Sequence, residues 1–529
     1  MRSWGCACDA PPMRRPPPSR ARSWRFPDCK SRGGAAKRRP LCRCGDHQER
    51  RKTMSILCEH LSARPARFFE EISAIPRASG QEAQIAAYLE RFAAARGLSC
   101  YRDAADNVLI CKPGSVGREA EPPLLLQAHT DMVTEVVFGH THDFSAEGVK
   151  LCVKGNILSA DSTTLGADDG FGVALMLAVL DGGAESHPPL ECLFTAAEEV
   201  GLIGAGQFDY SRLHARRMLN FDSAEEHLVI TGCCGGLRSD FSFPVTREPA
   251  EGIGLRLTLS GLCGGHSGED IHRGRGNALI TLGALLKKLE KHTPFRVVSF
   301  LGGDKDNAIP RDCVAEILPQ DMAAAKHFFA EAEALLAAWL TSPDDHPHLT
   351  VEEVAVKDAM TAADGEKLLR VLSVRNGVFY RRADGKQPPE TSRNLARVRM
   401  TDTAVSVAFS SRSPFDARLR ECTDELTALA GELGGAARHH AYYPGWEGVA
   451  DSPVSALWQR AYRATTGREI STTVIHAGLE CGLISSRLAG LDVVSLGCNI
   501  YDLHTPAERM ELDSLERVYR TLLAFLKDC

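Results

Sequence analysis

Acidic and histidine side chains occur in small clusters along this chain, and several clusters follow an apolar run. "LLLQAHTDMV" places His129 and Asp131 two residues apart, so on an extended strand both side chains face the same way. "TTLGADDG" places Asp168 and Asp169 between glycines, where a carboxylate could bridge two cations or simply cap a helix. Taken alone, a His-x-Asp pair is also typical of an ordinary surface loop.

Three further clusters extend this pattern. Glu198 and Glu199 follow the apolar run of "LFTAAEE", and burying both near one point would be costly without a cation. Asp222 ends "RMLNFD", and His504 lies in a loop after a late strand. Together the clusters predict a metal site, and imidazole and carboxylate ligands without thiolates suit zinc, manganese or cobalt. In such a site, two cations activate a water and polarise a carbonyl, and a nearby carboxylate such as Glu198 is the natural general base.

The segments around these clusters alternate between helical and strand-like patterns. Apolar residues have helical spacing over 70–97 and over 170–182, and each pattern stops at a glycine. Short β-rich runs lie between and after them, including "NVLICKPG", "PPLLLQAH", "LECLFT" and "RMLNFD". The alternation predicts an α/β fold, a sheet with helices on both faces, in which ligands bind outside the carboxyl ends of the strands.

The pattern changes between about 245 and 442 and then returns. The middle segment has alternating strands such as "TAVSVAFSSRS", helical stretches over 277–292 and 320–340, and few strand-end acids or histidines. We therefore predict one catalytic domain over 54–240 and 444–529, interrupted by an inserted α+β lid domain over 241–443.

Residues 1–53 differ from the rest of the chain. They contain fifteen Lys and Arg but four acids, a net charge of +11, so the overall charge of −6 leaves −17 for the remainder. They also hold seven Pro and five of the 18 Cys, without the spacing of a zinc finger or the apolar run of a secretory signal. An Arg-rich arm could bind nucleic acid. The interpretation that we favour is a disordered extension, or a start assigned upstream of the natural Met54, with no nucleic-acid partner.

The remaining thirteen cysteines are scattered, many within apolar runs, which is typical of buried thiols in a reducing compartment. The apolar stretch over 172–180 is far shorter than the ~20 residues that a membrane helix needs. We expect a soluble, cytoplasmic protein with no membrane partner.

Eight motifs, taken in order, carry a resemblance to a known family. The chain contains "AHTDMV", "TTLGADDG", "TAAEEVGLIGA", "NFDSAEE", "GGHSGEDI", "NAIPR", "HAGLECGL" and the His504 loop. In order and spacing these motifs resemble the dinuclear zinc exopeptidases of the aminoacylase and carboxypeptidase-G group, from about Met54 to the C-terminus. The resemblance implies a mixed sheet in the catalytic domain and two Zn²⁺ per subunit, with Mn²⁺ or Co²⁺ as substitutes.

Within that group the motifs are most similar to dipeptidases that act on Xaa-His substrates. This implies hydrolysis of unblocked dipeptides, including β-alanyl-histidine. Hydrolysis of N-acyl amino acids by the same metal pair is the alternative. Smaller relatives take one histidine from a partner subunit, whereas a lid this long could supply it within one chain, so the sequence leaves a homodimer open.

The resemblance also implies a role for individual residues. Five are implied to be metal ligands: His129, Asp168, Glu199, Asp222 and His504. Asp168 would bridge the two ions and be joined to Asp169 by a cis peptide bond, Asp131 would orient the imidazole of His129, and Glu198 would be the general base. Three residues of the lid are implied to bind substrate or its oxyanion: His266, Asn307 and Arg412. His476 and Glu480 are expected to line the pocket, without an assigned role.

Overall fold

The computed structural model describes residues 56–58, 60–382, 388–448 and 451–529. The chain divides into two units, Met1–Thr53 and Met54–Cys529, and the description below concerns the second. The predictions for residues 1–53 lie outside the described residues.

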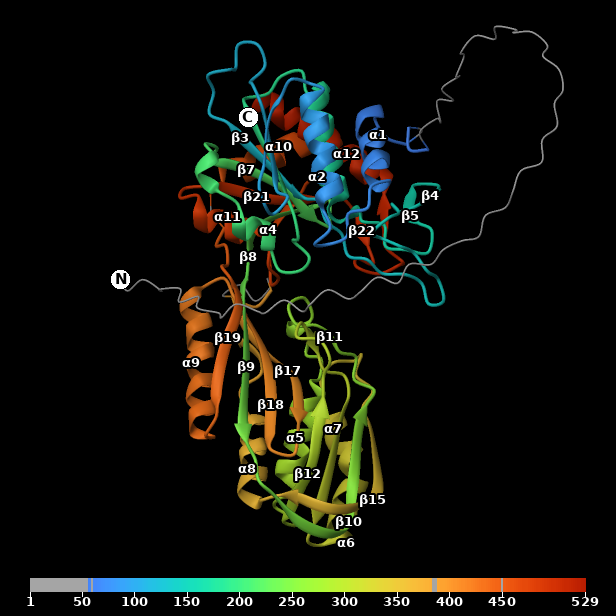
Figure 1. The fold of residues 1–529 in the computed structure, drawn as a ribbon, viewed down its shortest axis with the longest axis vertical. Helices are drawn as coiled ribbons and strands as arrows, with labels where there is room; N and C mark the ends of the chain where they lie inside the picture. Colours follow the sequence, from blue (N-terminus) through green and yellow to red (C-terminus); the bar gives the residue numbers. More distant parts are fainter. Residues whose placement is uncertain (1–55, 59, 383–387, 449–450) are drawn as a thin grey trace, which may run out of the picture. The chain divides into compact units, whose positions relative to one another are not determined.

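The second unit contains two large sheets, and the first is an eight-stranded mixed sheet (Figure 1). Its order is β1-β2-β6-β3-β7-β21-β8-β20. The strands are β1 (Ser99–Arg102), β2 (Val108–Lys112), β3 (Leu124–His129), β6 (Leu190–Thr195), β7 (Arg217–Ser223), β8 (Leu228–Cys233), β20 (Ser471–Ile475) and β21 (Asp492–Gly497). The central strand β3 runs parallel to both of its neighbours, β6 and β7. The predicted α/β fold with a mixed sheet is confirmed.

Helices cover both faces of this sheet, because successive residues of a strand point to opposite sides. On β3, Leu124 and Leu126 pack into one apolar core and Leu125 into another. The first core includes residues of α1 (Ala63–Ser73), α2 (Ala83–Ala94), α3 (Ala167–Ala178), α10 (Pro453–Thr466) and α12 (Leu512–Asp528). The second includes residues of α4 (Ile203–Gln207) and α11 (Glu480–Arg487).

The structure differs from the prediction over 70–97. The helical spacing there belongs to two helices, α1 and α2, because Pro76 and Gly80 interrupt the segment between them. Gly80 has φ +81°, a value that glycine adopts more readily than other residues. The segment over 320–340 is likewise divided into α6 (Met322–Ala330) and α7 (Ala332–Trp339).

A second sheet is antiparallel in every pairing of its strands. Its order is β15-β10-β14-β12-β17-β18-β9-β19, with β16 paired to β17. The strands are β9 (Gly235–Pro244), β10 (Arg247–Ser260), β12 (Phe295–Gly302), β14 (Cys313–Pro319), β15 (His348–Met360), β16 (Gly377–Tyr380), β17 (Thr391–Met400), β18 (Ala404–Ser413) and β19 (Ala436–Tyr443). It shares an apolar core with α5 (Ala278–Leu289), α6, α7, α8 (Ala362–Val371) and α9 (Asp416–Glu432).

The chain passes from the first sheet to the second between β8 and β9, and returns after β19. The two connections meet, because the backbone N–H and C=O groups of Cys233 and Trp446 form a pair of hydrogen bonds of 2.9 and 3.0 Å. The predicted domain boundaries stay predictions.

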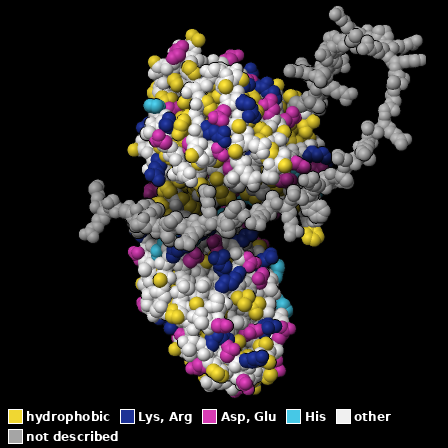
Figure 2. Space-filling view, in the orientation of Figure 1, with side chains coloured by type: hydrophobic (Ala, Val, Ile, Leu, Met, Phe, Trp, Pro, Cys, Tyr) yellow, Lys and Arg dark blue, Asp and Glu magenta, His cyan; other side chains and the backbone are white. Residues whose placement is uncertain are grey.

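Charged side chains of both signs are interspersed over the face shown in Figure 2, which is typical of a solvated surface. The cysteines from Cys100 to Cys529 are free thiols; seven of them are buried, whereas Cys100 and Cys263 are exposed. Among the helices of the described residues, none is long and apolar enough to cross a membrane.

Candidate metal centre

The carboxyl ends of three adjacent strands carry predicted site residues. His129 is the last residue of β3, and Asp222 is the last but one of β7. Glu198 and Glu199 follow β6, after a residue with φ +52°, Ala197, that turns the chain. Because β6, β3 and β7 are parallel neighbours, these side chains meet at one edge of the sheet.

Asp168 lies between histidines that are far apart in sequence. Its Oδ1 is 3.1 Å from Nε2 of His129, and its Oδ2 is 3.3 Å from Nε2 of His504. His504 belongs to the loop between β22 (Ile500–Tyr501) and β23 (Arg509–Glu511), in a small sheet with β4 (Leu151–Lys154) and β5 (Ile157–Ala160). The peptide bond from Asp168 to Asp169 is cis, as the resemblance implies.

Three sets of side chains in the described residues have potential ligand atoms within 4.8 Å of one another. The first is His129, Asp168 and Asp222; the second is Asp168, Glu199 and His504; the third is His129, Glu198 and Glu199. Asp168 belongs to the first two sets, so one carboxylate is placed to serve two cations. The structure therefore brings the five predicted ligands together.

The electrostatics of the cluster fit bound cations. Burial, reinforced by the neighbouring carboxylates, raises the pKa of Asp222 and that of Glu198 well above their usual values. Burial also opposes ionisation of Asp168, but hydrogen bonds with His129 and His504 hold the pKa of Asp168 below its usual value. The Oδ2 atom of Asp222 is buried and has no hydrogen-bond partner. Gathering these acids is costly unless positive charge compensates them, so the residues present fit a pair of metal ions.

Asp131 supports this cluster from behind. Its Oδ1 accepts a hydrogen bond from the backbone N–H of Glu198 (3.0 Å) and lies 3.3 Å from Nδ1 of His129. Its Oδ2 accepts from the backbone N–H of Glu199 (3.2 Å) and from the hydroxyl of Ser79 (2.8 Å). One carboxylate thus contacts the imidazole and also holds the turn that carries both glutamates.

The Asp169 carboxylate accepts hydrogen bonds from backbone N–H groups. Its Oδ2 accepts a hydrogen bond from the N–H of His129 (3.1 Å) and its Oδ1 from the N–H of Gly172 (3.2 Å). The sequence left open whether this pair binds cations or caps a helix. In the structure Asp168 faces the histidines, as a metal ligand would, and Asp169 binds main-chain groups, including one at the start of α3.

A cavity of about 610 Å³ adjoins the cluster. Eight of the ten predicted site residues line it: Asp168, Glu198, Glu199, Asp222, His266, Asn307, Arg412 and His504. The other two, His129 and Asp131, are buried behind the lining. Residues of the predicted lid and the metal-ligand cluster therefore face the same space within one chain.

Short strands hold the lid residues in place. His266 ends β11 (Gly265–His266), which pairs with β13 (Ala308–Ile309), and the backbone C=O of Asn307 accepts from the N–H of Ser267 (2.8 Å). Nη2 of Arg412 is 3.4 Å from Nε2 of His266. Burial, together with the nearby Arg412 charge, lowers the pKa of His266 to about 4, so its imidazole is neutral at pH 7.

Comparisons with known proteins agree with this geometry. The model of Peptidase family M20/M25/M40 matches residues 125–528. The chain belongs to this family. It is 35% identical to the cytosol non-specific dipeptidase of Escherichia coli over 466 residues, which cover 87% of this chain and 96% of the relative.

Two solved structures have a similar fold. The aminoacylhistidine dipeptidase from Vibrio alginolyticus superposes with a TM-score of 0.79 and 34% identity, covering 88% of this chain and 97% of that chain. Aminopeptidase PepT from Bacillus cereus is 16% identical with a TM-score of 0.51, covering 89% of this chain and 99% of that one, and shows a likeness of fold alone. The family resemblance inferred from the motifs is confirmed.

The prediction that His476 and Glu480 of this M20 chain line the pocket is wrong. Both side chains are buried, and the cavity is lined instead by the residues between them, Ala477, Gly478 and Leu479. His476 points into the interior, where its Nε2 is 2.6 Å from Oγ of Ser392. Burial and the Arg412 charge lower the pKa of His476 to about 3. Burial raises the pKa of Glu480 to about 7.

Sequence reasoning missed three residues that shape the M20 site. Arg77 is buried and donates to the backbone C=O groups of Thr130 and Asp131, at 3.1 Å each. Glu508 accepts from the N–H groups of the three residues before Asp168, at 2.8, 3.0 and 2.8 Å. The hydroxyl of Tyr443 accepts from Nη1 of Arg412 (2.9 Å). Each acts through contacts distant in sequence, so no local pattern indicates it; only the place of Glu508, four residues after His504, is suggestive.

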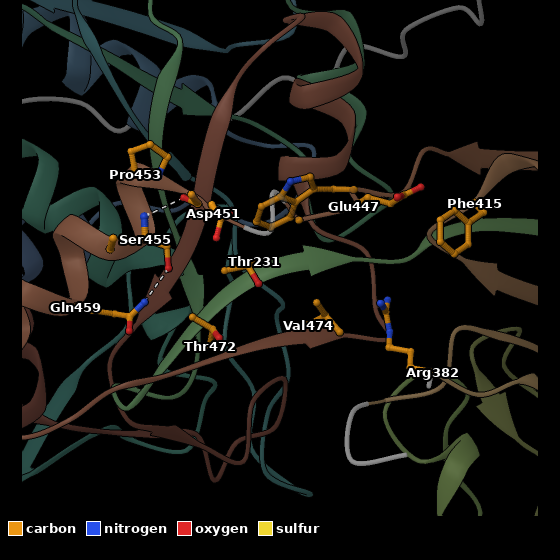
Figure 3. Close-up of a pocket in the computed structure, with 14 residues that line it drawn as sticks. Thr231, Arg382, Phe415, Glu447, Asp451, Pro453, Ser455, Gln459, Thr472 and Val474 are labelled. Atoms are coloured by element: carbon orange, nitrogen blue, oxygen red, sulfur yellow. Dashed lines mark hydrogen bonds between the residues drawn. The ribbon is translucent and has the colours of Figure 1, made fainter. Parts of the chain in front are cut away.

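A second cavity of about 560 Å³ lies elsewhere in the M20 chain (Figure 3). It is lined mostly by polar side chains, including those of Thr231, Arg382, Glu447, Asp451 and Gln459. None of the ten predicted site residues lines this cavity, so we do not assign the reaction to it.

Proposed function

We propose that this chain is a metal-dependent dipeptidase that hydrolyses unblocked dipeptides, including Xaa-His substrates such as β-alanyl-histidine. One observation carries the proposal: a ligand set for two cations, sharing Asp168, faces the same cavity as the guanidinium of Arg412. The relatives support it, since one is a cytosol non-specific dipeptidase and another an aminoacylhistidine dipeptidase.

Five residues would hold the metal pair: His129, Asp168, Glu199, Asp222 and His504. Zinc suits these ligands, and manganese or cobalt are substitutes. When bound, the two ions would polarise the scissile carbonyl and make a water molecule a stronger acid.

Glu198 is proposed as the general base. Glu199 lies with Asp168 and His504 in one candidate ligand set, and the adjacent Glu198 lies beside His129 and also lines the cavity, where it could accept a proton. Its backbone N–H is held by Asp131, so the carboxylate is presented from a fixed turn. Glu198 would take a proton from the attacking water and return it to the leaving amine.

Arg412 is proposed to bind the carboxylate of the substrate. Its Nε is buried and has no hydrogen-bond partner, so one donor of a charged side chain is available. Arginine and carboxylate form strong paired hydrogen bonds. His266 would donate to the oxyanion of the transition state, and Asn307 would position the substrate.

A paired assay tests the proposal against its alternative. A dipeptide panel with Xaa-His and Xaa-Leu members is compared with the same peptides acetylated at the N-terminus, with added Zn²⁺, Mn²⁺ or Co²⁺. We expect hydrolysis of the free dipeptides and little of the acetylated ones. Preferential cleavage of the acetylated peptides would instead make the chain an N-acyl amino acid amidohydrolase.

We also propose a cytoplasmic location, as the name of the Escherichia coli relative suggests. His266 and Asp168 of one chain line the same cavity, so the site does not require a histidine from a partner subunit. The proposed function is therefore compatible with a monomer or a homodimer. Sedimentation of the purified protein determines the oligomeric state.

A further inference from the structure

Three polar side chains of the first sheet and one of α11 form a continuous hydrogen-bonded network. The amide of Asn220 donates to Oε1 of Gln127 (2.7 Å), whose own amide donates to Oε2 of Glu480 (2.6 Å) and to the hydroxyl of Thr195 (3.1 Å). Thr195 in turn donates to Oε2 of Glu480 (2.7 Å). All four side chains are 0% exposed. We call Gln127, Thr195, Asn220 and Glu480 the buried polar bridge.

The bridge lies next to the metal-ligand cluster in the register of the sheet. Gln127 is two residues before His129 on β3, and Asn220 is two residues before Asp222 on β7, so each pair shares a face of its strand. Gln127 and Asn220 are register partners. His129 and Asp222 therefore each have a bridge residue two positions earlier on the same face of the strand.

The third strand joins through Thr195. Thr195 ends β6, is the register partner of His129, and is three residues before Glu198. The carboxylate of Glu480, at the first residue of α11, contacts both Gln127 and Thr195. One acid from a helix near the end of the chain thus ties together the strands that present His129, Asp222 and Glu198.

The bridge is a poor choice if its only role is stability. It is embedded in the apolar core that contains Leu125, Leu193 and Met218. Both partners of Glu480 Oε2 are neutral, and its Oε1 is buried with no hydrogen-bond partner. Burying a carboxyl group among neutral partners costs free energy, and the buried Oε1 gains no hydrogen bond in return. Another role has to account for it.

We propose that Glu480 is a positioning residue of the metal centre, holding Gln127 and Thr195 so that β3, β6 and β7 present their ligands and base in one arrangement. This inference rests on the proposed function, because it assumes that metal binds at His129, Asp168 and Asp222. Groups hydrogen-bonded directly to metal ligands typically change metal affinity or activity by about 10–100-fold when they are removed, and Glu480 acts on the strands of His129 and Asp222 through Gln127 and Asn220.

The test compares Glu480→Met with Glu480→Gln in the full chain. Methionine removes the acceptor and suits an apolar core, whereas glutamine keeps one oxygen that can occupy the place of Oε2. We expect Glu480→Met to weaken Zn²⁺ binding by about 10–100-fold and to lower kcat by a similar factor at saturating metal, with KM little changed. Glu480→Gln should recover most of both.

Glu191→Met is the matched control. Glu191 lies on the same strand as Thr195, at the opposite end, and is also a buried acid, with Oε2 accepting from the backbone N–H of Ala215 (3.0 Å). Its replacement should alter the urea midpoint while Zn²⁺ affinity, measured by competition with a chelating dye, stays at the wild-type value. Wild-type Zn²⁺ affinity in folded Glu480→Met would overturn the proposal.

Thr195→Val provides a second, nearly isosteric variant if Glu480→Met does not fold. It removes the hydroxyl that donates to Glu480 and accepts from Gln127, and we expect Zn²⁺ affinity to fall by about 2–10-fold. An unchanged affinity would contradict the inference. The readout by metal binding needs no substrate, so a wild-type chain that binds Zn²⁺ but cleaves no dipeptide would refute the proposed function and still test Glu480.

Discussion

Asp131→Asn is the substitution whose consequence the structure defines most closely. The carboxylate is completely buried, and each of its oxygens faces two groups. Oδ1 faces the N–H of Glu198 and the imidazole of His129, and Oδ2 faces the N–H of Glu199 and the hydroxyl of Ser79. An asparagine amide offers one oxygen and one NH₂ group. In either orientation, the NH₂ group opposes the backbone N–H of a glutamate.

The expected magnitude follows from that opposition. Leaving a buried donor unsatisfied costs about 1–3 kcal/mol. Since about 1.4 kcal/mol corresponds to a factor of ten, the loss is equivalent to roughly 5–150-fold in an equilibrium constant. We expect Asp131→Asn to lower the free energy of unfolding by that amount in metal-free buffer. Zn²⁺ affinity should fall by about 10–100-fold, because His129 and the turn of Glu198 and Glu199 are no longer held together.

Urea unfolding without metal and Zn²⁺ titration against a chelating dye measure the two effects separately. Ser79→Ala is the control, since it removes one hydroxyl donor to Asp131 and leaves both backbone hydrogen bonds intact. It should change neither quantity by more than about 1 kcal/mol. Asp131→Asn with wild-type stability and wild-type Zn²⁺ affinity would refute the reasoning.

Three further predictions follow from other parts of the structure. Glu198→Gln should lower kcat by at least about 10²-fold while bound metal, measured by elemental analysis, is retained; full activity would refute the role of the base. Arg412→Lys should raise KM for dipeptides more than it lowers kcat, because lysine cannot form paired hydrogen bonds with a carboxylate, and unchanged steady-state kinetics would contradict this. For Glu226, burial favours the neutral form, but hydrogen bonds from Arg517 and its other partners outweigh burial, so its pKa is below the usual value. Its stabilising effect should be complete above about pH 4.5 and disappear as pH falls through the lowered pKa of the folded state. Urea midpoints of wild type and Glu226→Gln should therefore differ at pH 7 and converge at acid pH, and a difference that persists at acid pH would count against this account.

Much of the site could be predicted because ligands bind at the carboxyl ends of parallel strands. Parallel neighbours in a sheet end at the same edge, so apolar runs followed by His129, Glu198 and Asp222 indicate that these side chains are close in space. This prediction needs only local patterns of apolar and acidic residues, which are visible in a single sequence. His504 is predicted in the same way, because it lies in a loop after a late strand, and the resemblance to the family supplies its expected role as a metal ligand.

Residue types alone do not predict the direction in which a side chain points. Asp168 and Asp169 have the same chemistry, yet one faces two histidines and the other binds backbone N–H groups. His476 and Glu480 belong to a motif that suggested a pocket, yet their side chains point into the interior. The direction of a side chain depends on the backbone around it and on which partners are within reach, and neither is encoded by spacing alone.

The sequence by itself determined the α/β class, the approximate extent of the strands, the metal-ligand residue types and the family, because these depend on periodicity, composition and the order of motifs. Only the tertiary structure decided that the segment over 70–97 is two helices and that Asp131 holds the turn of Glu198 and Glu199. It also decided that Glu480 closes a buried bridge with Gln127, more than 350 positions earlier in the chain. The physical reason is that hydrogen bonds between buried groups are specified by three-dimensional proximity, and partners so far apart in sequence leave no local signal.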